Sequence, residues 1–174
     1  MSSSHSGPED LASTPTTFNA LTPDAAEARL MICLGVRRWA RELATGRPYD
    51  STEALLAAAK AAGDLTDDEL HAALSGHPRI GERASSPEHQ GEMSEREQAG
   101  VDQGDATAVA DLAAGNAAYE ERFDRVFLIR AAGRSTPEIL AELRRRLDND
   151  DATERRETVT QLREIAVLRL KEML

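Results

Sequence analysis

Apolar residues recur along most of the chain at the three- and four-residue spacing of amphipathic helices. Ala is abundant and β-branched runs are few, which favours helix over sheet. The short apolar run Val126–Ile129 could be extended, but it is too isolated to imply a sheet. The pattern predicts an all-α, single-domain, multi-helix bundle. Its expected helices cover 23 to about 45, 51–63, 66 to about 75, 94 to about 104, about 107–123, 136 to about 147, and 151 to the end.

Local signals predict where several of these helices begin. Thr22 is a good N-cap and Pro23 suits the first helical position. Thr66 and Glu69 have the spacing of a capping box. We expect Asp151 to cap the last helix.

Two segments lack helical periodicity. Residues 1–17 are rich in Ser, Thr and Pro, and we expect a disordered tail followed by a domain over 18–174. Residues 76–93 are rich in Gly, Pro, Ser and His. A loop of that length within a helical domain is uncommon and often functional.

Arg169 stands on a face of the last helix that should be buried. Because a buried guanidinium needs an anionic partner, two interpretations are open. Arg169 forms an internal ion pair with another helix, or it projects into a cavity and holds an anionic substrate. The other members of its face are Leu162, Ile165, Ala166 and Met173.

Asn116 occupies a similar position one helix earlier. A buried Asn commonly ties down a loop backbone, so we expect a structural role. The apolar members of its predicted face are Val109, Leu112, Tyr119 and Phe123.

Ser94, Glu97 and Gln98 allow two interpretations. In the first, Ser94 caps a helix and Glu97 reaches back to form a capping box. In the second, the same i, i+3, i+4 spacing lets all three side chains converge on one ligand, beside the free amides of a helix N-terminus. The pattern alone favours the cap.

His77 precedes Pro78 in the sequence His77–Gly81. Pro78 favours an extended backbone at His77, and a firmly held imidazole suits acid–base chemistry near neutral pH. Most lone loop histidines are nevertheless surface residues. The other histidines make no metal-binding spacing with His77, so we expect no metal site.

Composition limits the remaining possibilities. The 174 residues are 40% hydrophobic, which is enough for one core, and the formal net charge is −10. That charge disfavours nucleic acid and anionic membrane as partners. We expect the basic run 144–146 to be a solvated helix face. With one cysteine, Cys33, no secretory signal and no long apolar segment, we expect a cytoplasmic protein.

Taken together, the polar motifs resemble those of 2-oxo-4-hydroxy-4-carboxy-5-ureidoimidazoline (OHCU) decarboxylases. The resemblance extends from about Phe18 to Leu174, and its specificity lies in the order and spacing of motifs that are individually weak. These motifs are His77–Gly81, Ser94-x-x-Glu97–Gln98, Asn116-x-x-Tyr119-x-x-Arg122–Phe123, Ile139–Leu140 and Arg146–Leu147-x-Asn149, with Phe18–Asn19, Cys33, Arg38–Ala40 and Arg47–Pro48 before them.

The resemblance implies an all-α homodimeric carboxy-lyase of urate degradation that uses no metal and no organic cofactor. It implies that His77 is the catalytic acid–base residue and that Glu97 is its polar partner. The substrate-binding residues that it implies are Pro78, Ser94, Gln98, Phe127, Leu128, Ile129 and Arg169, with Arg163 as an alternative to Arg169.

One segment departs from the family pattern. Where many members have a Phe-Gly-Phe-Pro-Phe-like segment, this chain reads Phe123–Ile129 without the glycine and the proline. We expect its substrate contacts to come mainly from the backbone of Phe127, Leu128 and Ile129. The departure also favours the alternative function, a helical ureide-binding or scaffold module without catalysis.

Overall fold

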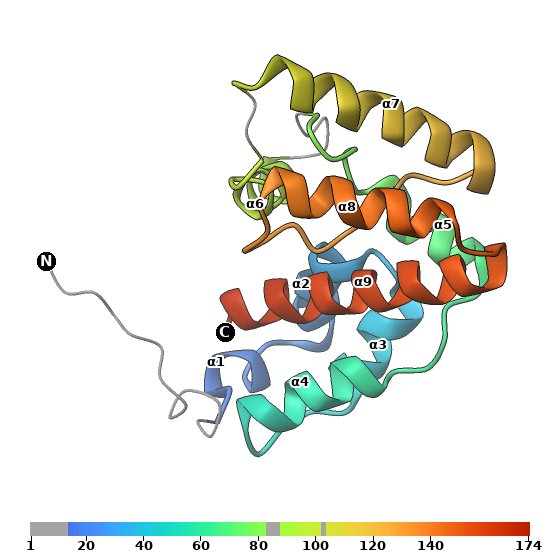
Figure 1. Cartoon of the computed structure of the whole chain (residues 1–174). Coiled ribbons are helices and arrows are strands. Elements are labelled where there is room, and N and C mark those ends of the chain that lie inside the picture. The colour runs from blue at the N-terminus through green and yellow to red at the C-terminus, as the bar shows by residue number, and fades with distance from the viewer. Residues whose placement is uncertain (1–13, 83–87, 102–103) are drawn as a thin grey trace, which may run out of the picture. The chain divides into compact units, whose positions relative to one another are not determined.

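The computed structural model describes residues 14–82, 88–101 and 104–174, and the side chains of these residues except 88–92. Every regular element in the described ranges is a helix, which confirms the all-α prediction (Figure 1). The helices are α1 (Thr16–Asn19), α2 (Pro23–Leu34), α3 (Arg37–Thr45), α4 (Thr52–Ala61), α5 (Asp67–Ser75), α6 (Glu88–Glu97), α7 (Ala106–Phe123), α8 (Thr136–Leu147) and α9 (Asp151–Glu172).

The chain forms two compact units. The first comprises the chain up to Gly63 together with Ile165–Leu174, and the second comprises Asp64–Glu164. The predicted tail over 1–17 lies mostly outside the described residues. Its last part is helical, since α1 begins at Thr16.

The first unit is built around α2, α3 and α4. The Trp39 side chain is buried, and its indole nitrogen donates a hydrogen bond to the Ala59 carbonyl at 3.1 Å, which joins α3 to α4. The prediction of one helix from 23 to 45 was wrong at Gly35. This residue ends α2 with a φ of 76°, a left-handed conformation that glycine adopts without strain.

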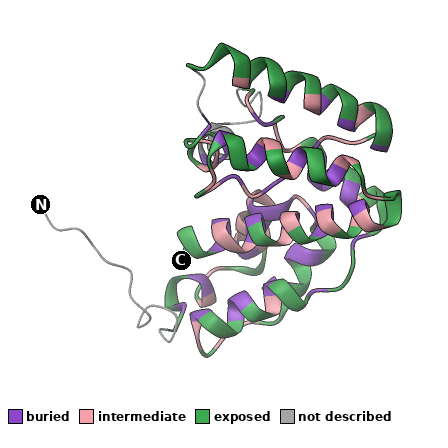
Figure 2. Ribbon diagram, viewed as in Figure 1, coloured by how far each residue is buried: buried purple, intermediate pink, exposed green. Residues whose placement is uncertain are grey.

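The second unit has a core formed mainly by α7, α8 and the segment between them. α7 and α8 pack side by side, and buried positions alternate with exposed ones along α8 (Figures 1 and 2). Gly115 permits this close approach, because a Cβ at that position would lie 2.3 Å from Leu143 Cδ2. The core cluster consists of Ile80, Val101, Leu112, Tyr119, Phe123, Phe127, Ile129, Ala131, Ile139 and Leu143.

The helix starts agree with most of the predicted caps. Thr22 accepts a hydrogen bond from the Ala25 amide, and Thr66 forms a complete capping box with Glu69. The predicted cap of the last helix was wrong by one residue. The Asp150 carboxylate accepts the Thr153 amide at 2.7 Å, so Asp151 is the first helical residue.

The predicted helix start at Ser94 was wrong. α6 already begins at Glu88 and ends at Glu97, so Ser94 is an interior residue of the second half of the helix. Met93 and Ser94 are both buried. Burial of this face outweighs the weak helix preference of the preceding residues. The part of the predicted loop at 83–87 lies outside the described residues, as do residues 102–103 of the predicted helix end.

Arg146 corrects the prediction of a solvated basic run at 144–146. Arg144 and Arg145 are exposed, but Arg146 is only 1% exposed and pairs with the fully buried Glu154. Both Nε and Nη2 of Arg146 donate to Glu154 Oε1, at 2.8 and 2.5 Å. The Tyr119 hydroxyl donates to the same carboxylate oxygen, so this ion pair is embedded in the second unit.

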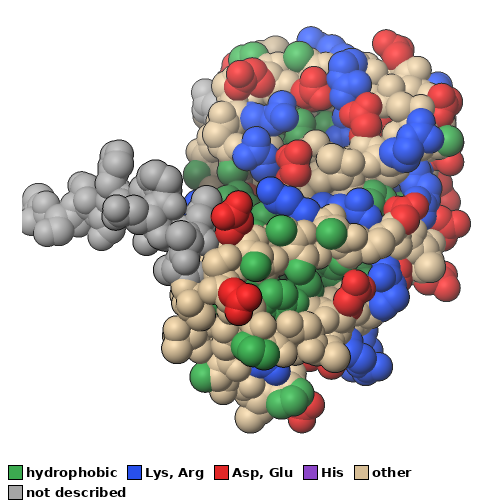
Figure 3. Space-filling model, turned by 90° about the horizontal axis from the view of Figure 1, so that it is seen from below, with side chains coloured by type: hydrophobic (Ala, Val, Ile, Leu, Met, Phe, Trp, Pro, Cys, Tyr) green, Lys and Arg blue, Asp and Glu red, His purple; other side chains and the backbone are tan. Residues whose placement is uncertain are grey.

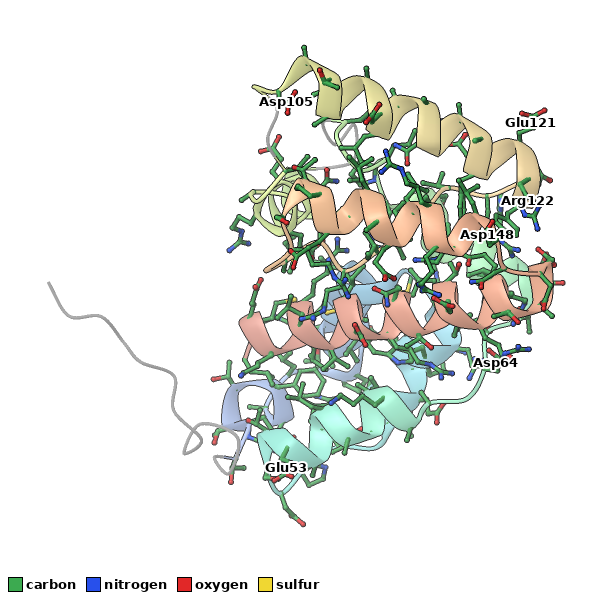
Figure 4. All side chains as sticks on the ribbon, viewed as in Figure 1. Glu53, Asp64, Asp105, Glu121, Arg122 and Asp148 are labelled. Atoms are coloured by element: carbon green, nitrogen blue, oxygen red, sulfur yellow. The ribbon has the colours of Figure 1, made fainter. Side chains whose placement is uncertain are left out.

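The α7 and α8 ends of the second unit are also joined by polar contacts. Arg122 is labelled at the end of α7 in Figure 4, near Asp148 at the end of α8. Its Nη2 donates to the Asn149 carbonyl at 2.9 Å.

No described helix has both the length and the apolar character needed to cross a membrane. On the face shown in Figure 3, acidic and basic side chains are interspersed.

Candidate active site

The His77–Gly81 segment follows α5 directly. The His77 amide donates to the Leu74 carbonyl at 3.0 Å, so the residue is fixed to the last turn of α5. Pro78 has no amide hydrogen and cannot continue the helical pattern. Both His77 and Pro78 are half-buried. His77 therefore lies directly after the last turn of α5, in a segment whose backbone is tied to that helix.

Gln98 joins this loop to the end of α6. Its Oε1 accepts a hydrogen bond from the Gly81 amide at 2.9 Å. Gly81 has a φ of 90°, which is a conformation open to glycine and strained for other residues. Two motifs that are separated in the sequence are therefore brought together in space. The contact uses the carbonyl oxygen of the Gln98 side chain, so that its NH2 group could donate a hydrogen bond to a substrate.

Asn116 holds the same loop from α7. The residue is 4% exposed, and its Nδ2 donates to the Ile80 carbonyl at 3.1 Å. This confirms the predicted role of Asn116 as a tie to a loop backbone. Leu112, Tyr119 and Phe123 share the buried face as predicted, whereas Val109 was predicted wrongly and is 38% exposed.

Arg79 adds an ion pair between the loop and α7. Its Nε and Nη2 donate to the two carboxylate oxygens of Glu120, at 2.5 and 2.9 Å. Hydrogen bonding to this guanidinium lowers the pKa of Glu120, and the same contact raises the pKa of Arg79. Both side chains remain charged at neutral pH. The pair could not be predicted from sequence spacing, because Arg79 and Glu120 are 41 positions apart.

Ser94 and Glu97 lie on α6, on the helical turn before Gln98. Ser94 is 3% exposed, and its carbonyl accepts the Gln98 amide at 3.0 Å within the helix. Glu97 is half-buried at the last helical position. The free amides of a helix N-terminus are therefore not available at Ser94, contrary to the second interpretation of its motif.

Phe127, Leu128 and Ile129 are all buried. The Phe127 ring packs edge-on against Tyr119 with a centroid distance of 5.2 Å. The Leu128 carbonyl accepts a hydrogen bond from Arg146 Nη1 at 2.6 Å. The segment is thus held by the buried ion pair, and its expected substrate contacts stay a prediction.

Arg169 is 2% exposed, as its position on a buried helix face predicted, and Arg163 is half-buried. In the first unit, burial raises the pKa of the Cys33 thiol to about 12, and the positive charge of Arg169 acts in the opposite direction. Arg169 belongs to the first unit and His77 to the second. The predicted convergence of the two side chains on one cavity stays a prediction.

A pocket of about 260 Å³ lies in the second unit, and three of its lining residues, Asp124, Arg125 and Val126, belong to the segment that departs from the family pattern. It brings together the last turn of α5 and the C-terminal end of α7, immediately before the His77 loop and beside Glu120. Its lining residues are His71, Leu74, Ser75, Glu120, Asp124, Arg125 and Val126. Within the described ranges, no three side chains of His, Cys, Asp or Glu gather closely enough to hold a metal ion.

Comparison with known proteins adds a decisive observation. The family model described as OHCU decarboxylase matches residues 19–171, which is nearly the whole chain. The chain belongs to the OHCU decarboxylase family. It is accordingly an enzyme of the carboxy-lyase class.

Relatives from distant organisms agree with this membership. The chain is 31% identical over 138 residues to the OHCU decarboxylase of Haloferax volcanii, covering 77% of this chain and 80% of the relative. It is 32% identical over 139 residues to that of Amia calva, covering 75% and 76%. A third relative is the bifunctional uric acid degradation protein TTL of Arabidopsis thaliana, 26% identical over 159 residues. That match covers 86% of this chain but only 48% of the relative, so the chain spans about half the length of that protein.

Solved structures share the fold. An OHCU decarboxylase crystallised in the presence of (S)-allantoin matches with a TM-score of 0.66 and 26% identity, covering 82% of this chain and 94% of the other. An (S)-allantoin synthase matches with a TM-score of 0.67 and 16% identity, covering 93% and 54%. The second likeness shows the fold alone.

Proposed function

We propose that this OHCU decarboxylase forms (S)-allantoin with His77 as its acid–base residue and Glu97 as the polar partner of His77. The hydrogen bond between Gln98 Oε1 and the Gly81 amide carries the proposal, because it joins the His77 loop to the α6 end on which Ser94 and Glu97 lie. The relative crystallised with (S)-allantoin supports the choice of product.

The substrate chemistry explains why side chains suffice for this reaction. One carbon of the five-membered ring carries both a carboxylate and a hydroxyl, and the neighbouring carbon is part of a C=N bond. When CO2 leaves, its bonding electron pair moves toward the C=N group, which accepts it. The protein therefore needs to orient the substrate and handle protons.

His77 is suited to this proton handling. We infer that His77 and Glu97 hydrogen-bond the substrate hydroxyl and direct its proton as CO2 departs. His77 follows the C-terminal end of α5, where helix carbonyls favour positive charge. Protonation of the neighbouring ring carbon, the former C=N carbon, from one face then gives the (S) enantiomer.

The other predicted residues would hold the substrate. Ser94 offers a hydroxyl and Gln98 an amide NH2 group, while Arg169 would bind an anionic or carbonyl oxygen. Pro78 and the backbone of 127–129 would complete the contacts. Because Ser94 lies inside α6, we assign no role to helix N-terminal amides.

The product's handedness tests this function. Substrate is generated freshly from urate with uricase and hydroxyisourate hydrolase, and product formation is followed by circular dichroism. We expect (S)-allantoin to form faster than in the enzyme-free reaction, which gives racemic product. Racemic allantoin at the enzyme-free rate would overturn the proposal and favour a non-catalytic module.

We further propose that the protein acts in the cytoplasm, and that it is a homodimer, as the resemblance implies. Light scattering after size-exclusion chromatography should give twice the chain mass of 18.9 kDa. A monomer at micromolar concentration would contradict the dimer.

A further inference from the structure

α7 holds two consecutive residues of the His77 loop with two side chains that are one helical turn apart. Asn116 Nδ2 donates to the Ile80 carbonyl at 3.1 Å. Four residues later, Glu120 binds the Arg79 guanidinium through both carboxylate oxygens. Positions i and i+4 lie on the same face of a helix, so α7 presents both anchors to the loop together.

We propose that Glu120 is a positioning residue, which fixes His77 for catalysis through its ion pair with Arg79. The inference rests on the proposed role of His77. Only Pro78 separates Arg79 from His77, and the fixed φ of proline makes the connection stiff. A displacement of Arg79 is therefore passed to His77 rather than absorbed between them.

The remaining anchors of the loop explain why the Glu120 contact matters. His77 is fixed at its amide by α5, and Ile80 and Gly81 are fixed by Asn116 and Gln98. Beside the Asn116 contact, the Arg79 side chain is a second link of the loop to α7, and it is the one nearer to His77. It is bidentate, which defines an orientation as well as a distance.

Because Arg79 and Glu120 are partly exposed, loss of their ion pair can affect the position of His77 without affecting stability. The side chains of Arg79 and Glu120 are 44% and 28% exposed. An ion pair at that exposure contributes little to the free energy of unfolding. In contrast, misplacing a catalytic group by about 1 Å can cost about 100-fold in rate. Loss of the pair should therefore lower turnover without unfolding the protein.

The test compares Glu120→Gln with a matched control, Glu142→Gln. Glu142 binds Arg145 within the same unit, and its side chain is 32% exposed. We expect Glu120→Gln to lower kcat about tenfold, with KM changed less than twofold. Glu142→Gln should retain wild-type kcat and KM. Urea unfolding should give both variants the same stability.

Exchange of the two charges provides a second arm. Arg79→Glu and Glu120→Arg should each reduce kcat, and the double variant should recover most of it, because the ion pair re-forms with its charges exchanged. An unchanged kcat in Glu120→Gln, or a double variant as slow as the single variants, would overturn the positioning role. Wild-type protein that produces only racemic allantoin would instead overturn the proposed function.

Discussion

Breaking the buried pair of Arg146 and Glu154 should cost more stability than breaking any exposed ion pair described in the second unit. Arg146 donates two hydrogen bonds to Glu154, one to the Leu128 carbonyl and one to the Thr158 hydroxyl. Its guanidinium also lies 4.8 Å from the centroid of the Phe127 ring. Arg146→Ala removes all of these contacts and leaves the Glu154 carboxylate buried without its countercharge.

The loss of stability in Arg146→Ala can be estimated, and Arg145→Ala is a matched control. Removing one partner of a buried ion pair costs about 3–5 kcal/mol. The neighbouring Arg145 also binds two carboxylates, but its side chain is 49% exposed. Arg145→Ala should therefore cost about 0–1 kcal/mol. For a chain of this size, the predicted loss in Arg146→Ala corresponds to a Tm lowered by about 6–20 °C.

Urea unfolding followed by far-ultraviolet circular dichroism measures this difference. Arg146→Ala should shift the midpoint strongly, with Arg146→Lys falling between Ala and wild type, because Lys keeps the charge but lacks the planar fork. If Arg146→Ala is no less stable than Arg145→Ala, the assignment of Arg146 to a buried pair is refuted.

Three further predictions concern packing, capping and titration. Gly115→Ala should lose about 1–2 kcal/mol of stability, because the added Cβ meets the buried Leu143. Gly63→Ala should keep its stability, because its added Cβ would meet no atom within 4 Å, and thermal unfolding compares the two variants. Thr66→Ala should cost about 1 kcal/mol in the same assay through loss of its capping box, and no loss would contradict the cap. Cys33, with its pKa raised to about 12, should not react with Ellman's reagent at pH 8 until the protein unfolds. The folded state favours the neutral Cys33 thiol, which contributes its full stability below the unfolded pKa of about 8.5. This contribution is lost as the pH rises toward 12, because the unfolded chain then loses its proton first.

Local signals predicted the helices that depend on local interactions. The capping box of Thr66 and the cap of Thr22 were readable because both use side chains within three residues of the helix start. Gly35 was missed because the apolar spacing continues across it. Its left-handed backbone ends α2, and the extended Val36 then precedes α3.

Ser94 shows where local reading fails. Its Ser-x-x-Glu spacing matches a capping box, yet the residue is buried inside α6. What decides its position is tertiary packing of Met93 and Ser94, which no spacing rule contains. One residue of the motif does reach the His77 loop, since Gln98 binds Gly81.

Arg146 and Arg169 both lie on apolar helix faces, but burial was predicted only for Arg169. The apolar stripe correctly predicted that Arg169 is buried. Ile139, Leu143 and Arg146 form the same kind of stripe, but the adjacent charges of the run at 144–146 obscured it. The partner, Glu154, lies on the next helix, and its identity depends on how α8 and α9 pack.

The role of His77 is tested by the rate of (S)-allantoin formation in His77→Ala, compared with that in His71→Ala. His71 is an exposed residue of α5, so its variant controls for loss of an imidazole nearby. We expect His77→Ala to lose most of its turnover while its helix content is unchanged, and His71→Ala to keep wild-type turnover. A His77→Ala variant with normal turnover would show that His77 is not the acid–base residue of the reaction.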